Sequence, residues 1–345
     1  KVISINVITM FKNLLLCIMV MVFSAFVPNK IPTSDPVLQD SLTAMMERKM
    51  EEIGAHSGQA IIMEVQTGEI KAMVGEGKPQ SSSLMRTVSL LAALESGKVK
   101  LSDTVDTKNG ILMVDDRPLK DHNWHRGGYG EITVEKGLMV SSNIATYENV
   151  KKAFGDGQAF IDMLRKMNYE TEGMLTPQDK EWESADLAWL SIGYNQQVYP
   201  YQVLTFYNAI ANEGKMVKPI LYKGETEIIN PQIASKENID SIQWALTLIV
   251  TEGLGKPAAS KKVKVAGAPG ASKISIVDDD SASNTFLEYS VEFCGFFPAD
   301  NPKYSVIVSM NKMGLPASGG LMAGSVFSEI VEFMMKKEAN DKEGN

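Results

Sequence analysis

Segments with the pattern of β-strands lie at both ends of this chain, and helix-forming segments lie between them. Residues 58–65 and 69–74 form a predicted hairpin around Gln66-Thr67-Gly68. Further strands are predicted at residues 263–276, 286–296 and 303–310. One sheet built from both groups has to bring the two ends of the chain together. The pattern therefore predicts a single mixed α/β domain with an antiparallel sheet flanked by helices.

Helical periodicity is found in six places, and residues 100–131 between them are rich in turns. The Ser34-Asp35-Pro36 triplet is a start signal for the first helix. The expected helices cover residues 36–53, 84–94, 133–150 with a break at 140–143, 201–212, 238–252 and 322–335. A chain of 345 residues is long enough for one large domain with appendages.

Composition excludes several classes of function. The net charge is −8 and no Lys/Arg block is present, so a nucleic-acid surface is not expected. Neither an internal repeat nor a phosphate-binding GxxxxGK[ST] loop occurs. The three histidines, His56, His122 and His125, lack the spacing of metal ligands, and the last two are interpreted as loop residues. No metal or cofactor is expected.

The first residues indicate export. A lone Lys12 precedes the apolar run LLLCIMVMVFSAFV at residues 14–27, and prolines follow it. Residues 1–28 are predicted to be either a cleaved signal peptide or a retained membrane anchor, and the pattern leaves both open. Residues 29–35 would then form a linker, 36–336 the domain, and 337–345 a polar, frayed tail.

Several segments resemble, in their order and across residues 36–335, the transpeptidase domain of penicillin-binding proteins of the cell-division and elongation type. These segments are GQAIIMEVQTGEIKAMV, LLAALESGKV, KDHNW, MVSSN, GYNQQVYPYQ, TFYNAIANEGKMVKP, VAGAPG and FCGFFPADNPKY. The resemblance implies a penicillin-binding-protein/serine β-lactamase-like fold with a helical subdomain. It also implies a place on the extracytoplasmic side of the bacterial inner membrane, and peptidoglycan stem peptides or β-lactams as ligands. Other proteins of cell-wall synthesis are possible partners. The N-terminal pedestal domain usual in such proteins is expected to be absent.

That family uses three motifs, SxxK, SxN and KTG. The resemblance places the nucleophile at Ser83 and puts Arg86 where the base lysine belongs. SxN is intact, with Ser141 and Asn143 at its ends. KTG is replaced by Ala268, Pro269 and Gly270, and the backbone N–H of Ala271 would complete the oxyanion hole with that of Ser83.

The changes in SxxK and in KTG each remove groups that the family uses for catalysis or substrate binding. A guanidinium has no lone pair to accept a proton near neutral pH, so Arg86 cannot serve as the general base for Ser83. Ala268 removes a cation, and Pro269 removes a hydroxyl and a backbone donor, which only an edge strand tolerates. Lys273 is no substitute, because its odd separation from residue 268 places it on the other face of the strand.

Three functions remain open at this point: an inactive homologue that binds peptide or a partner, a working D,D-transpeptidase or carboxypeptidase with an unusual base, and a slow β-lactam sensor. Ser83 is also a candidate helix cap, and Asn143 a candidate structural residue. Trp124 and Tyr129 are expected to pack rather than to stack on substrate. The spellings Ser309-x-x-Lys312 and Thr133-x-x-Lys136 are interpreted as coincidental.

Overall fold

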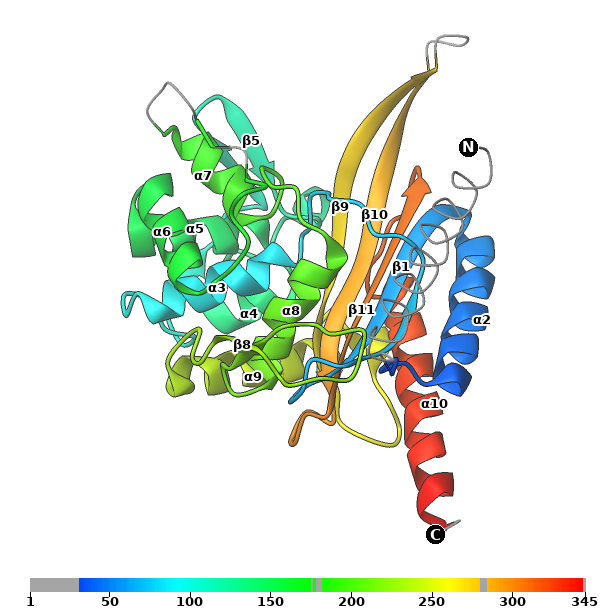
Figure 1. The fold of residues 1–345 in the computed structure, drawn as a ribbon. Coiled ribbons are helices and arrows are strands. Elements are labelled where there is room, and N and C mark those ends of the chain that lie inside the picture. Colours follow the sequence, from blue (N-terminus) through cyan, green and yellow to red (C-terminus); the bar gives the residue numbers. More distant parts are fainter. Residues whose placement is uncertain (1–30, 175, 178–181, 280–283, 344–345) are drawn as a thin grey trace, which may run out of the picture.

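The centre of the fold is a five-stranded antiparallel sheet that combines both ends of the chain. The computed structural model describes residues 31–174, 176–177, 182–279 and 284–343. Strand order is β2–β1–β11–β10–β9 (Figure 1). The strands are β1 Ala55–Glu64, β2 Ile70–Val74, β9 Ala266–Asp279, β10 Asn284–Phe297 and β11 Tyr304–Met313. The predicted hairpin, the three late strands and the joining of the two ends are confirmed.

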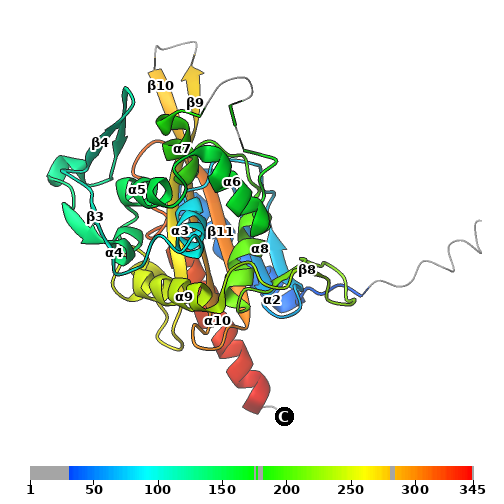
Figure 2. The ribbon, with the colours of Figure 1, turned by 90° about the vertical axis from the view of Figure 1, so that its left-hand side faces the viewer.

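Side chains that alternate along the strands separate two hydrophobic cores. On β1, Ile61 and Met63 belong to one core, while Ala60 and Ile62 belong to the other. Helices α2 Pro36–Ile53 and α10 Ala323–Glu343 cover the second core (Figure 1). The first core is larger and is filled by the central helices on the opposite face of the sheet, which Figure 2 shows from that side. Each face of the sheet is therefore buried.

Helix α3 Met85–Glu95 lies in the middle of the larger core, and its residues 85–94 are all buried. Around it pack α4 Val134–Met139, α5 Asn143–Phe154, α6 Gly157–Lys166, α7 Ser184–Ser191, α8 Pro200–Ala211 and α9 Lys236–Thr251. Short elements connect them: strand pairs β3 Thr104–Asp106 with β6 Glu131–Thr133, β4 Ile111–Val114 with β5 Arg117–Lys120, β7 Met216–Val217 with β8 Ile228–Asn230, and 3-10 turns η1 Trp124–Arg126 and η2 Lys256–Ala258. Helices α6 and α7 were not predicted.

The first and last helices, α2 and α10, test two of the predictions. Asp35 caps α2 as predicted, accepting a hydrogen bond from the Leu38 N–H at 3.0 Å. Residues 337–343 of the tail expected to be frayed instead continue α10 to Glu343, and residues 344–345 lie outside the described part of the chain. Lys and Glu, the commonest residues there, are good helix formers, and Lys337 pairs with Asp341 one turn later and with Asp35 of the α2 cap.

In the part of the chain that the structure describes, no helix combines the length and the apolar character needed to cross a bilayer.

Candidate active site

Ser83 lies two residues before the start of α3, against β9. It is 2% exposed, and its Oγ donates to the Ala271 carbonyl oxygen at 3.1 Å and shares a hydrogen bond of 2.7 Å with the Ser272 Oγ. The helix cap position is occupied by Leu84, with no side-chain hydrogen bond. The alternative that Ser83 is a helix cap is therefore wrong, because its hydroxyl is directed to the sheet and not to the first turn of the helix.

Arg86 extends from the first turn of α3 and is 8% exposed. Its Nη1 donates to the Asn143 Oδ1 at 3.2 Å. Within the described part of the chain, no carboxylate lies within ion-pair distance of this guanidinium. Burial lowers the pKa of Arg86, while nearby acidic groups, among them Asp121 and Glu292, oppose that shift. Arg86 is a buried cation with unused donors.

The break between α4 and α5 positions the SxN residues. Ser142 caps α5: its Oγ accepts from the Ala145 N–H at 3.0 Å and donates to the Asp121 carboxylate at 2.8 Å. Burial raises the pKa of Asp121. Ser141 has a φ of 52°, which a non-glycine residue rarely adopts. Within this motif, the middle residue Ser142 caps the helix and bonds to Asp121. Ser141 and Asn143 lie on either side of it.

Asn143 connects two parts of the site. Its Nδ2 donates to the Lys120 carbonyl oxygen at 2.9 Å, and its Oδ1 accepts from Arg86. Both hydrogen bonds fix the orientation of the amide, since one end is held by a donor and the other by an acceptor.

The strand that carries Ala268, Pro269 and Gly270 is an edge strand, as predicted, because β9 pairs with β10 and ends the described sheet. Its ladder is regular from Ala266 to Lys273, so Ala268 and Lys273 point to opposite faces. Ala268 is buried in the larger core. Pro269 is tolerated because an edge strand needs no donor on its free side.

A cavity of about 560 Å³ lies between α3, the SxN break, β9 and the loop after β11. Its polar lining residues are Arg86, His122, Ser141, Asn143 and Ser318. The rest of the lining is apolar or glycine: Gly253, Leu254, Pro257, Pro269, Gly270, Ala271, Ala317, Gly319, Gly320 and Leu321. Six of the eight residues predicted for the site line this cavity. Ser83 and Ala268 are not among its lining residues, because Ser83 is covered by its contacts with β9 and Ala268 faces the core.

His122 is a site residue that sequence reasoning missed by treating it as a loop residue. It lines the cavity beside Arg86, and its Nε2 is 3.1 Å from the Tyr129 hydroxyl. Burial lowers the pKa of His122, and the charge of Arg86 lowers it further, against the effect of Asp121. The neutral imidazole is therefore favoured. The available signal was its place in the KDHNW segment, next to the buried Asp121.

Glu292 is the second residue that was missed. It lies in β10, 1% exposed, where its carboxylate accepts from the Ser82 Oγ at 2.7 Å and from the Ser309 Oγ at 3.4 Å. A lone acid in the apolar segment YSVEFCGFF was the signal. Burial raises the pKa of Glu292 to about 7, although these hydrogen bonds and Arg86 lower it. Ser82, the neighbour of Ser83, is thus held to the sheet by a buried acid.

The remaining sequence interpretations are also settled by position. Ser309 and Lys312 lie on β11, where Lys312 donates to the carbonyls of Met313 and Gly314, so they form no SxxK turn. Thr133 caps α4. Trp124 does not pack in a core as expected, because it is 44% exposed and lies under the Lys120 ammonium.

Comparison with known proteins agrees with this architecture. Residues 58–332 match the family model described as the penicillin binding protein transpeptidase domain. Penicillin-binding protein PbpB of Mycolicibacterium smegmatis is 23% identical over 88% of this chain and 54% of its own length. Stage V sporulation protein D of Bacillus subtilis is 27% identical over 73% of this chain and 41% of its own length. The chain spans about half the length of the curated relatives it matches.

Solved structures show the same fold. The TP domain of penicillin-binding protein 3 from Burkholderia pseudomallei superposes with a TM-score of 0.75 at 22% identity, covering 90% of this chain and 97% of that one. Penicillin binding protein 3 of Mycobacterium tuberculosis, in a structure described as complexed with aztreonam, also gives a TM-score of 0.75 at 20% identity, covering 90% and 79%.

Proposed function

Since this chain belongs to the family of penicillin-binding protein transpeptidase domains, we propose that it is a cell-envelope protein whose cleft binds a peptide carboxylate without completing acyl transfer. It acts on the extracytoplasmic side of the bacterial inner membrane, with residues 1–28 serving as signal peptide or anchor. Its ligand is a peptidoglycan stem peptide ending in D-Ala–D-Ala, the substrate class that the family implies.

The observation that carries the proposal is the replacement of the base by a buried guanidinium. Acyl transfer by a serine needs a neighbouring group that takes the hydroxyl proton, and a guanidinium keeps its own protons at any ordinary pH. Loss of such a base costs about 10²–10⁴ in rate. The Ser83 hydroxyl also donates to the Ala271 carbonyl, which is no proton acceptor for catalysis.

The cavity supports binding in place of chemistry. Arg86 is buried and makes no ion pair with a described carboxylate, so an incoming carboxylate that pairs with it directly stabilises the buried charge. Arg86 has donors to spare beyond the one used by Asn143, and it lines the cavity. The apolar lining residues, among them Leu254, Pro269 and Leu321, suit the methyl groups of two alanines.

Two measurements test this function. The first is the intact mass of the protein after prolonged incubation with a penicillin, which we expect to be unchanged. A stable adduct that disappears in Ser83→Ala would overturn the claim that acyl transfer is lost, and would favour the β-lactam sensor.

The second measurement is calorimetric titration with a stem peptide that carries either a free C-terminal carboxylate or an amide. A hydrogen bond to a charged group contributes about 1.5–3 kcal/mol, so Arg86→Ala should weaken binding of the carboxylate peptide by about tenfold or more. Binding of the amide should change little. Ser83→Ala and Arg165→Ala, the latter an exposed arginine of α6, are the matched controls and should bind like wild type. Equal affinity of wild type and Arg86→Ala for the carboxylate peptide would refute the proposed ligand contact.

A further inference from the structure

A group of exposed apolar side chains surrounds the point where the described chain begins. Ile31 is 61% exposed, Leu221 51% and Tyr222 48%. They lie on two short segments that run side by side, since Pro32 forms an antiparallel bridge with Tyr222. We call these three residues together with Pro32 the entry patch. Exposed apolar groups of this kind mark a surface that contacts something other than water.

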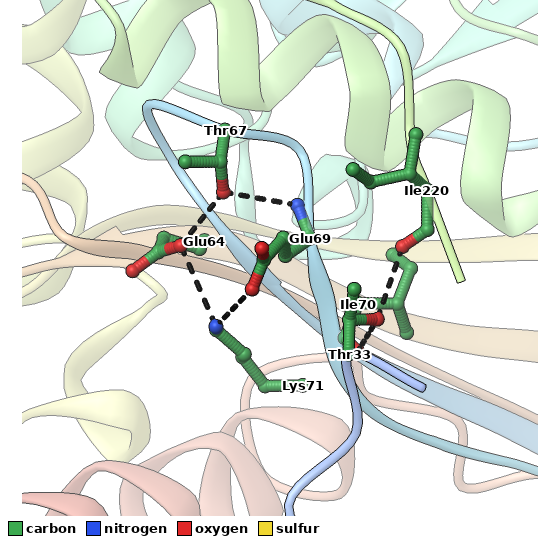
Figure 3. Close-up of polar contacts among 7 residues, drawn as sticks. All are labelled: Thr33, Glu64, Thr67, Glu69, Ile70, Lys71 and Ile220. Carbon is green, nitrogen blue, oxygen red and sulfur yellow. Dashed lines mark hydrogen bonds and ion pairs between the residues drawn. The ribbon is translucent and has the colours of Figure 1, made fainter. Parts of the chain in front are cut away.

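The entry patch is rigidly held to the domain. The Thr33 N–H donates to the Leu221 carbonyl at 3.1 Å, and the Lys223 N–H donates to the Ile31 carbonyl at 2.8 Å. The Thr33 hydroxyl reaches the carbonyls of Ile70 and Ile220, at 2.7 and 3.2 Å, as Figure 3 shows. Thr33 is buried. Residue 31 therefore cannot move away from residues 220–223 without breaking these contacts.

The sequence immediately before the entry patch contains the apolar run at residues 14–27. Only residues 28–30 separate Val27 from Ile31. A fully extended chain covers at most about 3.3–3.6 Å per residue, so Ile31 lies within about 14 Å of the end of the run. If the run enters a bilayer, the entry patch is brought to the surface of that bilayer by the covalent chain alone.

Charged side chains also lie around the entry patch. Lys218 pairs with Glu227 at 2.8 Å. On the neighbouring hairpin Lys71 is held by Glu69 at 2.5 Å and by Glu64 at 3.5 Å (Figure 3). These two cations are paired with acids. Lys223, which adjoins Tyr222 in the sequence, is exposed and forms no ion pair within the described part of the chain, so the entry patch has one cation at its edge. Apolar side chains with a tyrosine among them suit the boundary between headgroups and acyl chains.

We propose that the entry patch rests in the interfacial layer of a lipid bilayer and so fixes the orientation of the domain on the membrane. This inference rests on the membrane-anchored form of the proposed function, in which residues 14–27 are retained. The contact is made by the apolar side chains, and the exposed Lys223 at the edge of the entry patch adds attraction where the lipid is anionic.

The test uses the full chain in phosphatidylcholine vesicles, with a spin label at Leu221→Cys in a Cys17→Ser background. The other cysteine, Cys294, is buried and unreactive in the folded protein. Paramagnetic relaxation by oxygen, which concentrates in lipid, is compared with relaxation by a water-soluble nickel complex. Leu315→Cys is the matched control, since Leu315 is 73% exposed on the loop after β11.

We expect the label at position 221 to favour oxygen over nickel several-fold more strongly than the label at position 315. Equal nickel accessibility of the two labels would overturn the inference. So would shielding of position 221 from both reagents, which would indicate that a second copy or the chain's own apolar run covers the entry patch.

Two further measurements distinguish failure of this inference from failure of the proposed function. A label on the native Cys17 reports whether the apolar run itself lies in lipid. If it does while position 221 stays in water, the entry patch is not a bilayer contact although the anchor stands. Titration of the same vesicles with the stem peptide tests the cleft independently, because no residue of the entry patch lines the cavity.

Discussion

At the scale of single residues, the buried ionisable groups around the site include a cation, Arg86, and an acid, Glu292, that act on each other. Arg86 lies on α3 and Glu292 on β10, and each shifts the pKa of the other. Ser82 connects the acid to the segment that carries Ser83, through its hydrogen bond of 2.7 Å to Glu292. The negative charge of the ionised acid partly balances the buried guanidinium, although burial favours its neutral form.

Glu292→Gln should alter the pH dependence of stability. The pKa of Glu292 is raised to about 7, above its value of 4.5 in an unfolded chain, so the folded state binds this proton more tightly. The resulting stabilisation is complete below about pH 4.5 and is lost as the pH rises through 7, a decline of roughly 3 kcal/mol. The neutral glutamine lacks this decline.

Urea denaturation between pH 5 and pH 8 checks this prediction, with the exposed Glu237→Gln as control. The wild type should lose free energy of unfolding relative to Glu292→Gln as the pH rises. Parallel curves for these two proteins would mean that Glu292 is ionised throughout.

At the scale of elements, α4 and α5 each begin with a hydroxyl cap, and the two caps differ in burial. Ser142 is fully buried and serves both the Ala145 N–H and the Asp121 carboxylate. Thr133 caps α4 at the surface and serves only the Lys136 N–H, at 3.1 Å. Removal of the Ser142 cap should therefore cost more stability than removal of the Thr133 cap. Only at Ser142 are the former partners buried and unable to bond to water instead.

Ser142→Ala should lower the free energy of unfolding by about 2 kcal/mol or more, because it removes a cap and leaves Asp121 short of a donor. Thr133→Ala should cost about 1 kcal/mol or less. Chemical denaturation of the two variants gives the comparison. The Arg86–Asn143 contact should weaken only in Ser142→Ala, and equal costs for the two variants would argue against a role of burial here.

At the scale of the whole molecule, one sheet separates two hydrophobic cores. Alternate residues of the same strands contribute to each core. Phe327 of α10 packs on Phe293 and Phe297, with ring centroids 4.8 and 6.0 Å apart. Phe296, the residue between them in the same strand region, belongs to the opposite core. A substitution that destabilises the core under α10 should therefore also destabilise the core under the central helices, because the two cores share these strands.

Phe327→Ala should destabilise the protein by about 3–5 kcal/mol. The four tryptophans, Trp124, Trp182, Trp189 and Trp244, all precede the late strands and report on the other side of the sheet. Their fluorescence and the far-UV circular dichroism should shift to the same lower denaturant midpoint. The exposed Leu315→Ala should leave both unchanged. A tryptophan transition that stays at its wild-type midpoint would show that the two sides unfold separately.

The sequence by itself determined the type and order of the main elements, the antiparallel sheet from both chain ends, and the presence of a guanidinium, which accepts no proton, at position 86. These follow from local patterns and from the chemistry of one side chain, and neither needs knowledge of distant contacts. Helix α6 was missed although the local signals were present, since Asp156 caps it and Phe160, Ile161 and Leu164 fall on its buried side. Helix α7 is short, and its start is held by distant Asp115, whose carboxylate accepts from the Ala185 N–H.

Only the tertiary structure decided what surrounds the site. Ser83 bonds to strand residues 188 and 189 positions further along the chain, and Ser82 to an acid 210 positions away. His122 becomes a cavity residue because the SxN break lies beside it. Burial, pKa and access depend on which surfaces meet, and the meeting of segments so far apart is a property of the packed sheet and helices rather than of any local stretch of sequence.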